Sequence, residues 1–354
     1  MAKPTVKLLK RYLLPTGAHS LDVRPDGSMV YAACQDGVYE LNLESGARRL
    51  LYPHESWVSG VAFHTGTHSL ISAGYDGALT WYDLAAGKVT RTVKAHEFWS
   101  WQMALSPDGR RVASVTGQYL AGGPKYEPAP EREPSVKLFD AVTGKLLHAL
   151  PHVPSVQAVA FSPDSRYVAA GNLMGEVRTW DAQTGAQVGT IKSDGFTSWG
   201  IIKNHHYIGG IFALHFAPGG EELLLAGMGP MEDPMAGNGR QLWQRYAWRA
   251  APPRMADETA KGSSGEGLME TLAFHPSGEW FVMAGRLRGG SWNAAFFNLA
   301  DGALLHSLNT DTRVTRACFT PDGKRLLLSG MRGQPGFKDG TIPDWGHVDL
   351  FEVQ

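Results

Sequence analysis

Residues 54–94 read HESWVSGVAFHTGTHSLISAGYDGALTWYDLAAGKVTRTVK, and this stretch decides the fold. Within it, four short runs alternate between apolar residues and polar or small ones: VSGVAF, SLISAG, ALTWYDL and KVTRTVK. Turns that contain glycine separate the runs, at Gly66, at Asp76–Gly77 and at Gly87. Alternation with a period of two, broken by glycine turns, predicts a meander of four antiparallel strands.

The same unit recurs seven times along the chain, and two markers identify it. The first marker is the end of the first strand with its turn: DVRPDG from Asp22, AFHTGT from Ala62, ALSPDG from Ala104, AFSPDS from Ala160, HFAPGG from His215, AFHPSG from Ala273 and CFTPDG from Cys318. The second marker is the turn after the third strand, which ends at Gly46, Gly87, Gly144, Gly185 and Gly302. Proline, aspartate and glycine are the residues that such turns require. Because one four-stranded unit cannot bury both of its faces alone, the units are expected to pack side by side.

The two ends of the chain indicate how a ring of such units would close. The seventh unit has only three strands, whereas residues 6–14, VKLLKRYLL, alternate but belong to no complete unit. Using this run as the missing fourth strand leaves no sheet edge exposed. The sequence therefore predicts an all-β protein, a seven-bladed β-propeller of four-stranded antiparallel blades whose last blade is closed by the N-terminal strand. A single domain over residues 1–354 is expected, with blades at roughly 15–53, 54–94, 95–151, 152–192, 193–256, 257–309 and 310–354, and with residues 5–14 completing the last one.

Composition narrows the range of partners and compartments. The net charge is −1, so there is no basic excess of the kind that binds nucleic acid. No apolar run reaches the roughly 18–20 residues of a membrane helix, and the N-terminus lacks the apolar segment of a secretory signal. The two cysteines, Cys34 and Cys318, fall in units that would be neighbours in a ring. A disulfide between them is conceivable, but buried free thiols and a cytoplasmic location fit better.

The units resemble WD40 repeats across essentially the whole chain. Unit four carries the pair Trp180–Asp181, and unit two carries the variant Trp-Tyr-Asp that starts at Trp81. In the WD40 family a histidine, a strand-two serine or threonine, a turn aspartate and a strand-three tryptophan form a structural hydrogen-bonded tetrad. The resemblance implies that His54, Ser72, Asp76 and Trp81 form this tetrad in unit two. Unit five matches the pattern least well, and an irregular outer strand is expected there.

Long insertions fall almost entirely in the connections that share one face of a propeller, which family usage calls the top face. They lie between strands two and three or between blades, at residues 118–135, 193–210, 227–240, 253–268, 286–292 and 331–346. Binding residues concentrate in loops on a rigid scaffold. The alternative, neutral drift in surface loops, should decorate both faces. The top face is therefore the expected binding face.

Counting back four and six residues from the end of each first strand identifies positions at the mouth of the central channel. In WD40 proteins these positions often contact a partner, together with the residue before the turn aspartate. The resemblance implies a mouth with an aromatic and a charged side. The aromatic side comprises Trp57, Tyr75, Trp99, Trp101 and Phe212, and the charged side comprises His19, Glu270 and Arg313. Such a mouth suits a peptide or protein loop that inserts one aromatic or cationic side chain.

Catalytic motifs are missing from the sequence. There is no Gly-x-Ser-x-Gly elbow, no His-Glu-x-x-His pair and no glycine loop of the kind that binds phosphate. His205–His206 is weak evidence for a metal, so neither a metal nor a cofactor is expected. The expected function is a non-catalytic WD40 interaction scaffold that binds a protein or peptide through its loop-elaborated, tryptophan-rich top face. The alternative is an enzyme or small-molecule-binding propeller with its site at the central channel mouth. The partner's identity and the oligomeric state stay open.

Overall fold

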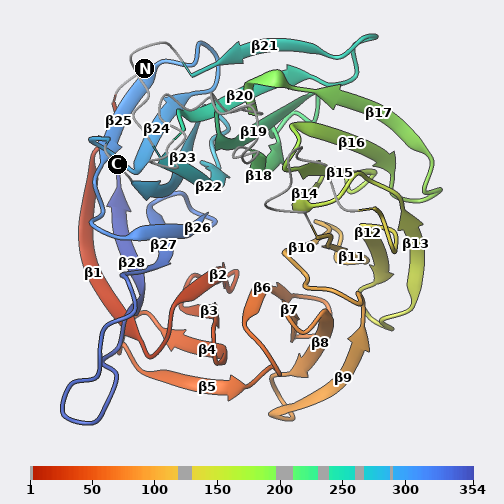
Figure 1. Cartoon of the computed structure of the whole chain (residues 1–354). Helices are drawn as coiled ribbons and strands as arrows, with labels where there is room; N and C mark the ends of the chain where they lie inside the picture. Colours follow the sequence, from red (N-terminus) through yellow and green to blue (C-terminus); the bar gives the residue numbers. More distant parts are fainter. Residues whose placement is uncertain (1–2, 119–129, 197–209, 230–238, 260–266, 288–289) are drawn as a thin grey trace.

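The computed structural model describes residues 3–118, 130–196, 210–229, 239–259, 267–287 and 290–354. It contains seven sheets of four antiparallel strands each, arranged as blades around a central axis (Figure 1). The predicted seven-bladed β-propeller is therefore confirmed.

The strands of each blade are numbered from the axis outward. Blade one contains β2 (Ala18–Val23), β3 (Met29–Cys34), β4 (Gly37–Asn42) and β5 (Arg48–Tyr52). Blade two contains β6 (Val58–His64), β7 (Ser69–Gly74), β8 (Ala78–Asp83) and β9 (Lys88–Lys94). Blade three contains β10 (Gln102–Leu105), β11 (Arg111–Val115), β12 (Val136–Asp140) and β13 (Leu146–Leu150). Blade four contains β14 (Val156–Phe161), β15 (Tyr167–Asn172), β16 (Glu176–Asp181) and β17 (Gln187–Lys192).

Blade five follows a short 3-10 helix, η1 (Asp194–Phe196). It contains β18 (Gly210–Phe216), β19 (Glu222–Met228), β20 (Gln241–Ala247) and β21 (Arg254–Glu258). Blade six contains β22 (Gly267–Phe274), β23 (Trp280–Leu287), β24 (Ala294–Asn298) and β25 (Leu304–Leu308). Blade seven contains β26 (Arg313–Phe319), β27 (Arg325–Met331), β28 (Gly346–Val353) and, outermost, β1 (Val6–Leu14).

The core of the protein lies between the blades. Each inner strand contacts the inner strands of both neighbouring blades, so that the seven together surround the axis. The alternation of the strands gives every sheet two apolar faces, and each face packs against the next blade. Between blades three and four, for example, Val115 and Leu138 form one buried cluster with Val159, Val168 and Trp180.

Six of the seven inner strands carry a register shift at the same level. The residue that the shift leaves unpaired is His19, Ser59, Gln157, Phe212, Glu270 or Thr315. Such a β-bulge inserts one extra residue and changes which side chains beyond it point to a given face. Two successive side chains per strand can therefore face the central channel, which simple alternation would not allow.

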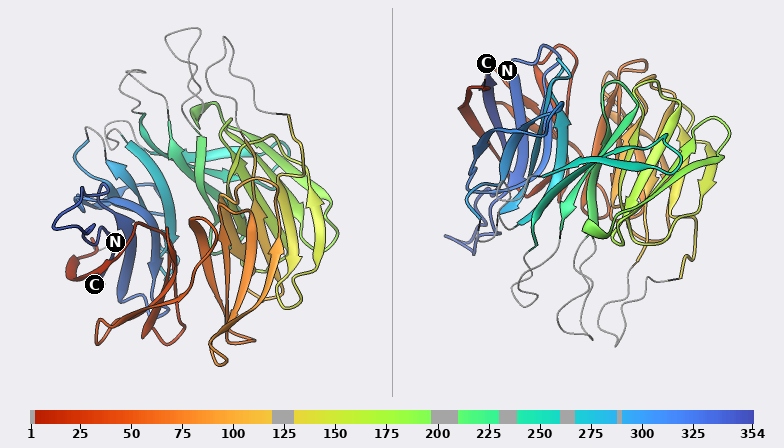
Figure 2. Two further views of the ribbon diagram at one scale, coloured as in Figure 1. Left: turned by 60° about the horizontal axis from the view of Figure 1, so that its bottom comes forward. Right: turned by 90° about the horizontal axis from the view of Figure 1, so that it is seen from above.

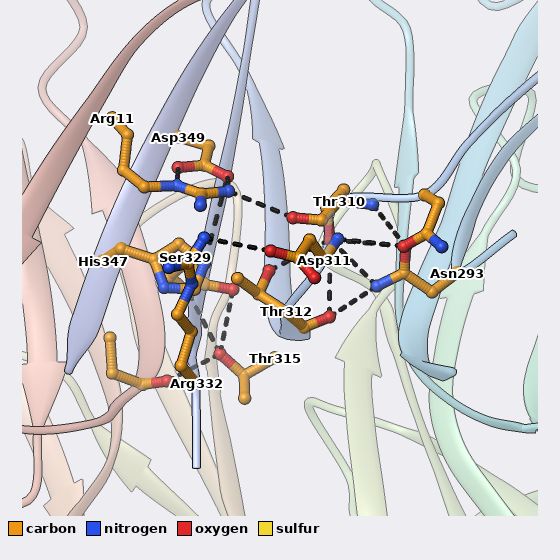
Figure 3. Close-up of polar contacts among 12 residues, drawn as sticks. Arg11, Asn293, Thr310, Asp311, Thr312, Thr315, Ser329, Arg332, His347 and Asp349 are labelled. Atoms are coloured by element: carbon orange, nitrogen blue, oxygen red, sulfur yellow. Dashed lines mark hydrogen bonds and ion pairs between the residues drawn. The ribbon is translucent and has the colours of Figure 1, made fainter. Parts of the chain in front are cut away.

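The N-terminal strand closes the ring, as predicted. β1 pairs antiparallel with β28 from Val6 to Leu14, and the two ends of the chain lie side by side (Figure 2). A buried ion pair fastens the two strands: the Arg11 guanidinium donates hydrogen bonds of 2.6 and 2.7 Å to the two oxygens of Asp349. Arg11 also donates to the carbonyl oxygen of Thr310 in the linker between blades six and seven, at 3.1 Å (Figure 3).

The expectation of an irregular outer strand in blade five is wrong. β21 pairs with β20 and has a single register shift, between Arg245 and Tyr246. Blade four has the same kind of shift between its two outer strands, at Thr179 and Trp180. Blade five lacks the turn sequence of its neighbours, but a different turn, in which the Ala250 N–H donates to the Ala247 carbonyl, connects its outer strands.

Cys34 and Cys318 are both free thiols, and burial raises the pKa of each, that of Cys318 to about 12. Within the residues that the structure describes, no helix has the length and apolar character needed to span a membrane.

Candidate functional site at the mouth of the central channel

The top face is the end of the ring at which the inner strands begin. A hollow of about 200 Å³ lies at the channel mouth on this face, and residues from all seven blades line it. The seven residues four positions before the strand ends all take part: His19, Ser59, Trp101, Gln157, Phe212, Glu270 and Thr315. The structure thus brings these separate positions together around one opening.

The bulges add lining residues that strict alternation places elsewhere. Ser20, Gly60 and Arg316 directly follow bulge residues, yet they line the same hollow. The sequence offered no signal for them, because a bulge leaves no fixed residue type at its position. Gln102 lines the hollow too, as the first residue of β10, which has no register shift.

Six rings from three blades form a continuous stack at the rim, here called the aromatic cluster: His19, Trp57, Tyr75, Phe98, Trp99 and Trp101. His19 stacks on Trp57 with ring centroids 5.5 Å apart. Tyr75 stacks on Trp99 at 4.8 Å and meets Trp101 edge-on at 5.4 Å. Phe98, which was not predicted, extends the stack by packing on Trp99 at 5.0 Å.

The members of the aromatic cluster differ in their accessibility. Trp57 and Trp99 are 46% and 42% exposed, which is high for tryptophan. Trp101 lies deeper, and its indole N–H donates to the Gly117 carbonyl at 2.9 Å. Phe212 lines the hollow from blade five. The cluster therefore offers two partly exposed tryptophan side chains that neighbouring rings hold in place.

The charged side of the mouth consists of an ion pair between two blades. Arg313 of blade seven donates two hydrogen bonds, of 2.7 and 2.8 Å, to the two carboxylate oxygens of Glu270 in blade six. This bidentate geometry is the strong form of the arginine–carboxylate pair, and the charge of Glu270 raises the pKa of Arg313. Glu270 is therefore neutralised by its partner and is not a free carboxylate.

Two buried polar atoms in the hollow have no hydrogen-bond partner among the described residues. They are Nε2 of His19 and Oγ of Ser59. Burial, with a smaller contribution from Arg313, lowers the pKa of His19 to about 4, so its ring is neutral at neutral pH. Buried polar groups without partners are rare in proteins, and each one needs an explanation, such as a bound water or ion.

The predicted tetrad of blade two needs one correction. His54 Nδ1 donates to Asp76 at 3.0 Å, and His54 Nε2 lies 2.7 Å from Ser72 Oγ. Trp81 does not take part in these tetrad hydrogen bonds, because its indole N–H donates to the Ala141 carbonyl of blade three at 2.6 Å. Successive strand residues point to opposite faces, so Trp81 faces blade three.

Tyr82 occupies the position that the tetrad tryptophan was expected to fill. It lies six residues after Asp76, as Trp180 of blade four lies six residues after Met174. Tyr82 stacks on Tyr52 at 4.7 Å, and the Tyr52 hydroxyl donates to Ser72 Oγ at 2.9 Å. The sequence did carry a signal for Tyr82: the pairs Tyr82–Asp83 and Trp180–Asp181 lie at the same distance from the preceding turn.

The long connections leave the ring from the top face, as the strand register shows. The ends of β11, β19 and β27 pair with residues at the start of inner strands, such as Met228 with Gly210 and Met331 with Arg313. Parts of these connections lie outside the described residues, as do Trp199 and His205–His206. Trp292 and Trp345 are buried and pack into the structure beneath.

In the described ranges, no group of three or more histidine, cysteine, aspartate or glutamate side chains is arranged to hold a metal ion.

Comparison with known proteins gives matches to repeat proteins. The family model described as "WD domain, G-beta repeat" matches residues 47–83 and 144–181. Telomerase protein component 1 of Rattus norvegicus is 31% identical over 160 residues, which are 45% of this chain and 6% of that protein. COMPASS component SWD3 of Saccharomyces cerevisiae is 25% identical over 178 residues, 48% of this chain and 52% of that protein. Small ribosomal subunit protein RACK1 of Caenorhabditis elegans is 25% identical over 143 residues, 40% of this chain and 39% of that protein.

These matches each cover less than half of the chain, and the telomerase component is far longer than the part it shares. The repeat matches fall on blades one to four, and all seven blades have the same strand order. Two segments of the chain therefore match WD40 repeats, and the chain folds as a seven-bladed β-propeller.

Proposed function

We propose that this propeller is a non-catalytic interaction scaffold that binds a segment of a protein partner across the mouth of its central channel. The relatives support this in general terms, because their names describe parts of larger assemblies: a telomerase component, a COMPASS component and a ribosomal subunit protein. Propellers also host enzymes, so the fold alone does not decide the function.

The observation that carries the proposal is the exposure of Trp57 and Trp99 within the aromatic cluster. Tryptophan is enriched among the residues that dominate binding energy, and these two side chains are exposed next to residues that line the hollow. Because Tyr75 lies against both of them, with centroid distances of 5.9 and 4.8 Å, little side-chain entropy is lost when a partner binds.

The charges at the mouth favour an aromatic or apolar anchor over a cationic one. Glu270 is the single carboxylate among the lining residues of the hollow, and Arg313 already neutralises it. A lysine or arginine from a partner would gain cation–π attraction from the tryptophans. It would also meet the positive charges of Arg313 and Arg316.

The test is a double substitution, Trp57→Ala with Trp99→Ala. Trp101 is left intact because its indole hydrogen bond to Gly117 supports the rim. The matched control is Leu146→Ala with Val188→Ala, which removes two exposed apolar side chains, 46% and 49% exposed, from outer strands. Proteins captured from a lysate of the source organism are quantified by mass spectrometry for the wild type and both variants.

We expect at least one partner to be captured by the wild type and the control but not by the tryptophan variant. Equal capture by all three proteins would contradict the proposal. If a small molecule co-purifies with the wild type or is turned over by it, and the tryptophan variant loses this property, the alternative of a small-molecule site at the same mouth is favoured.

A further inference from the structure

Among the described residues, one cation that lines the mouth hollow has no hydrogen bond or ion pair. Arg316, on β26, lines this hollow and also a second one of about 480 Å³ that lies along the same channel. The bulge at Thr315 turns its side chain to the channel. Arg316 is thus shared by the two hollows.

Arg316 makes no hydrogen bond or ion pair with any residue that the structure describes. Three other arginines around blade seven are paired, Arg11 with Asp349, Arg313 with Glu270 and Arg332 with Asp311. Arg325, at the start of β27, has no ion pair within the described residues either, but it is exposed to solvent. Two carboxylates line the second hollow with Arg316: Asp108, which pairs with Arg111, and Asp22, which Arg316 attracts electrostatically without a hydrogen bond. The Asp22 oxygens instead accept the backbone N–H groups of Val23 and Phe63, at 2.8 and 2.7 Å. A charge in a partly enclosed channel is costly when it has no partner.

The two buried atoms without hydrogen bonds lie in the same hollow as Arg316. Ser59 can donate from its hydroxyl, and the neutral ring of His19 can carry its proton on Nε2 and donate from there. Together with the guanidinium, these groups provide several donors for one acceptor-rich group. A carboxylate, with two oxygens that each accept more than one hydrogen bond, matches this set.

We propose that the mouth hollow is a carboxylate-binding subsite in which Arg316, with Ser59 and His19, binds the carboxylate of a partner segment. This inference rests on the proposed function and specifies it, since the apolar part of the same segment would lie on Trp57 and Trp99. The lining residues carry two positive charges and one negative charge, on Arg313, Arg316 and Glu270. The balance of one positive charge suits a singly charged carboxylate better than a doubly charged phosphate.

The experiment begins with a selection of random displayed peptides on the purified protein. Selected peptides are expected to contain an aromatic residue together with aspartate, glutamate or a free chain end. A selected peptide is then synthesised in three forms that distinguish the sources of the carboxylate: glutamate with an amidated end, glutamine with an amidated end, and glutamine with a free end. Succinate is titrated separately as a small carboxylic acid. Binding is measured by calorimetry.

The variant Arg316→Gln removes the cation, and Arg332→Gln is the matched control, because it removes an exposed top-face arginine whose partner is Asp311. For the wild type, exchanging the carboxylate for an amide should weaken binding roughly tenfold to a hundredfold, as expected for hydrogen bonds to a charged group. The same exchange should have no effect in Arg316→Gln and its full effect in Arg332→Gln. Circular dichroism verifies that each variant is folded, and Arg316→Lys should recover part of the preference.

The outcomes separate the two proposals. If peptides bind and depend on Trp57 and Trp99 but do not distinguish glutamate from glutamine, the carboxylate subsite is wrong and the proposed function stands. If no peptide binding depends on the tryptophans but succinate binds and Arg316→Gln abolishes it, the subsite stands and serves a small acid. If neither peptides nor succinate bind, both proposals fail.

Discussion

The ion pair that fastens the two ends of the chain should be one of the most sensitive points of the fold. The Asp349 side chain is 1% exposed, and Arg11 is the one residue in the described ranges that donates hydrogen bonds to its carboxylate. His347 Nε2 lies 3.9 Å from the same carboxylate, too far for a hydrogen bond (Figure 3). Replacing Arg11 with methionine keeps an apolar stem of similar length and leaves a buried charge without a partner.

The expected cost follows from the geometry. Removing one partner of a buried ion pair typically lowers the free energy of unfolding by about 3–5 kcal/mol. Because the Arg11 side chain is 23% exposed, water can reach the vacated place and hydrate Asp349 in part. The lower end of the range, about 3 kcal/mol, is therefore expected for Arg11→Met. The loss should appear as a lower urea midpoint, followed by tryptophan fluorescence and by circular dichroism.

Two further proteins make the test specific. Arg332→Met breaks an exposed pair, with side chains 58% and 83% exposed, and should cost less than about 1 kcal/mol. Arg11→Met combined with Asp349→Leu removes both charges and should be more stable than Arg11→Met alone. If Arg11→Met costs no more than Arg332→Met, or if the double variant is less stable than the single one, the pair does not hold the ring closed as described.

Three more outcomes are expected. Gly77 has a φ of +73°, and an added Cβ would clash with the carbonyl oxygen of His96, so Gly77→Ala should lower the free energy of unfolding by about 1–3 kcal/mol. The control is Gly219→Ala, whose added Cβ meets nothing within 4 Å. Equal urea midpoints for the two variants would contradict the expected loss. Deleting residues 1–14 exposes the edge of β28 and should lower the melting temperature of the entire protein in calorimetry, rather than leave it unchanged. Burial lowers the pKa of His152 to about 3, below the pKa of histidine in the unfolded chain. The neutral, buried His152 therefore contributes its full stabilisation above about pH 6.5, and the free energy of unfolding should fall by about 1.4 kcal/mol per pH unit below that pH. Urea midpoints that do not change with pH would refute this prediction.

The repeat pattern was sufficient to predict the ring because its markers are local. Proline, aspartate and glycine in the turn after each inner strand specify turn geometry directly, whatever the neighbouring blade contains. Closure by β1 was predictable for a similar reason, since an alternating run without a partner must pair somewhere. The Arg11–Asp349 pair was not predictable, because it joins residues from opposite ends of the chain and depends on their register.

The sequence predicted the site in outline, and the errors in that prediction have a common cause. The face of a strand residue depends on an exact count, and a shift of one position reverses it. Trp81 was placed in the tetrad one residue away from the position that Tyr82 fills. Arg316 was missed because the bulge at Thr315 changes the count within β26.

The order in which a ribosome makes this chain gives the closure a further consequence. Among the strands of the propeller, β1 is synthesised before all others and its pairing partner β28 after them, so the backbone donors and acceptors of β1 have only water or other molecules to bind until the other blades have been made. Leu8 and Leu9 lie in this strand and stay about half exposed even in the folded protein, at 47% each. A nascent chain would thus carry an apolar, unpaired strand throughout elongation, which is a segment that chaperones recognise. Slow translation near the C-terminus would prolong that exposure.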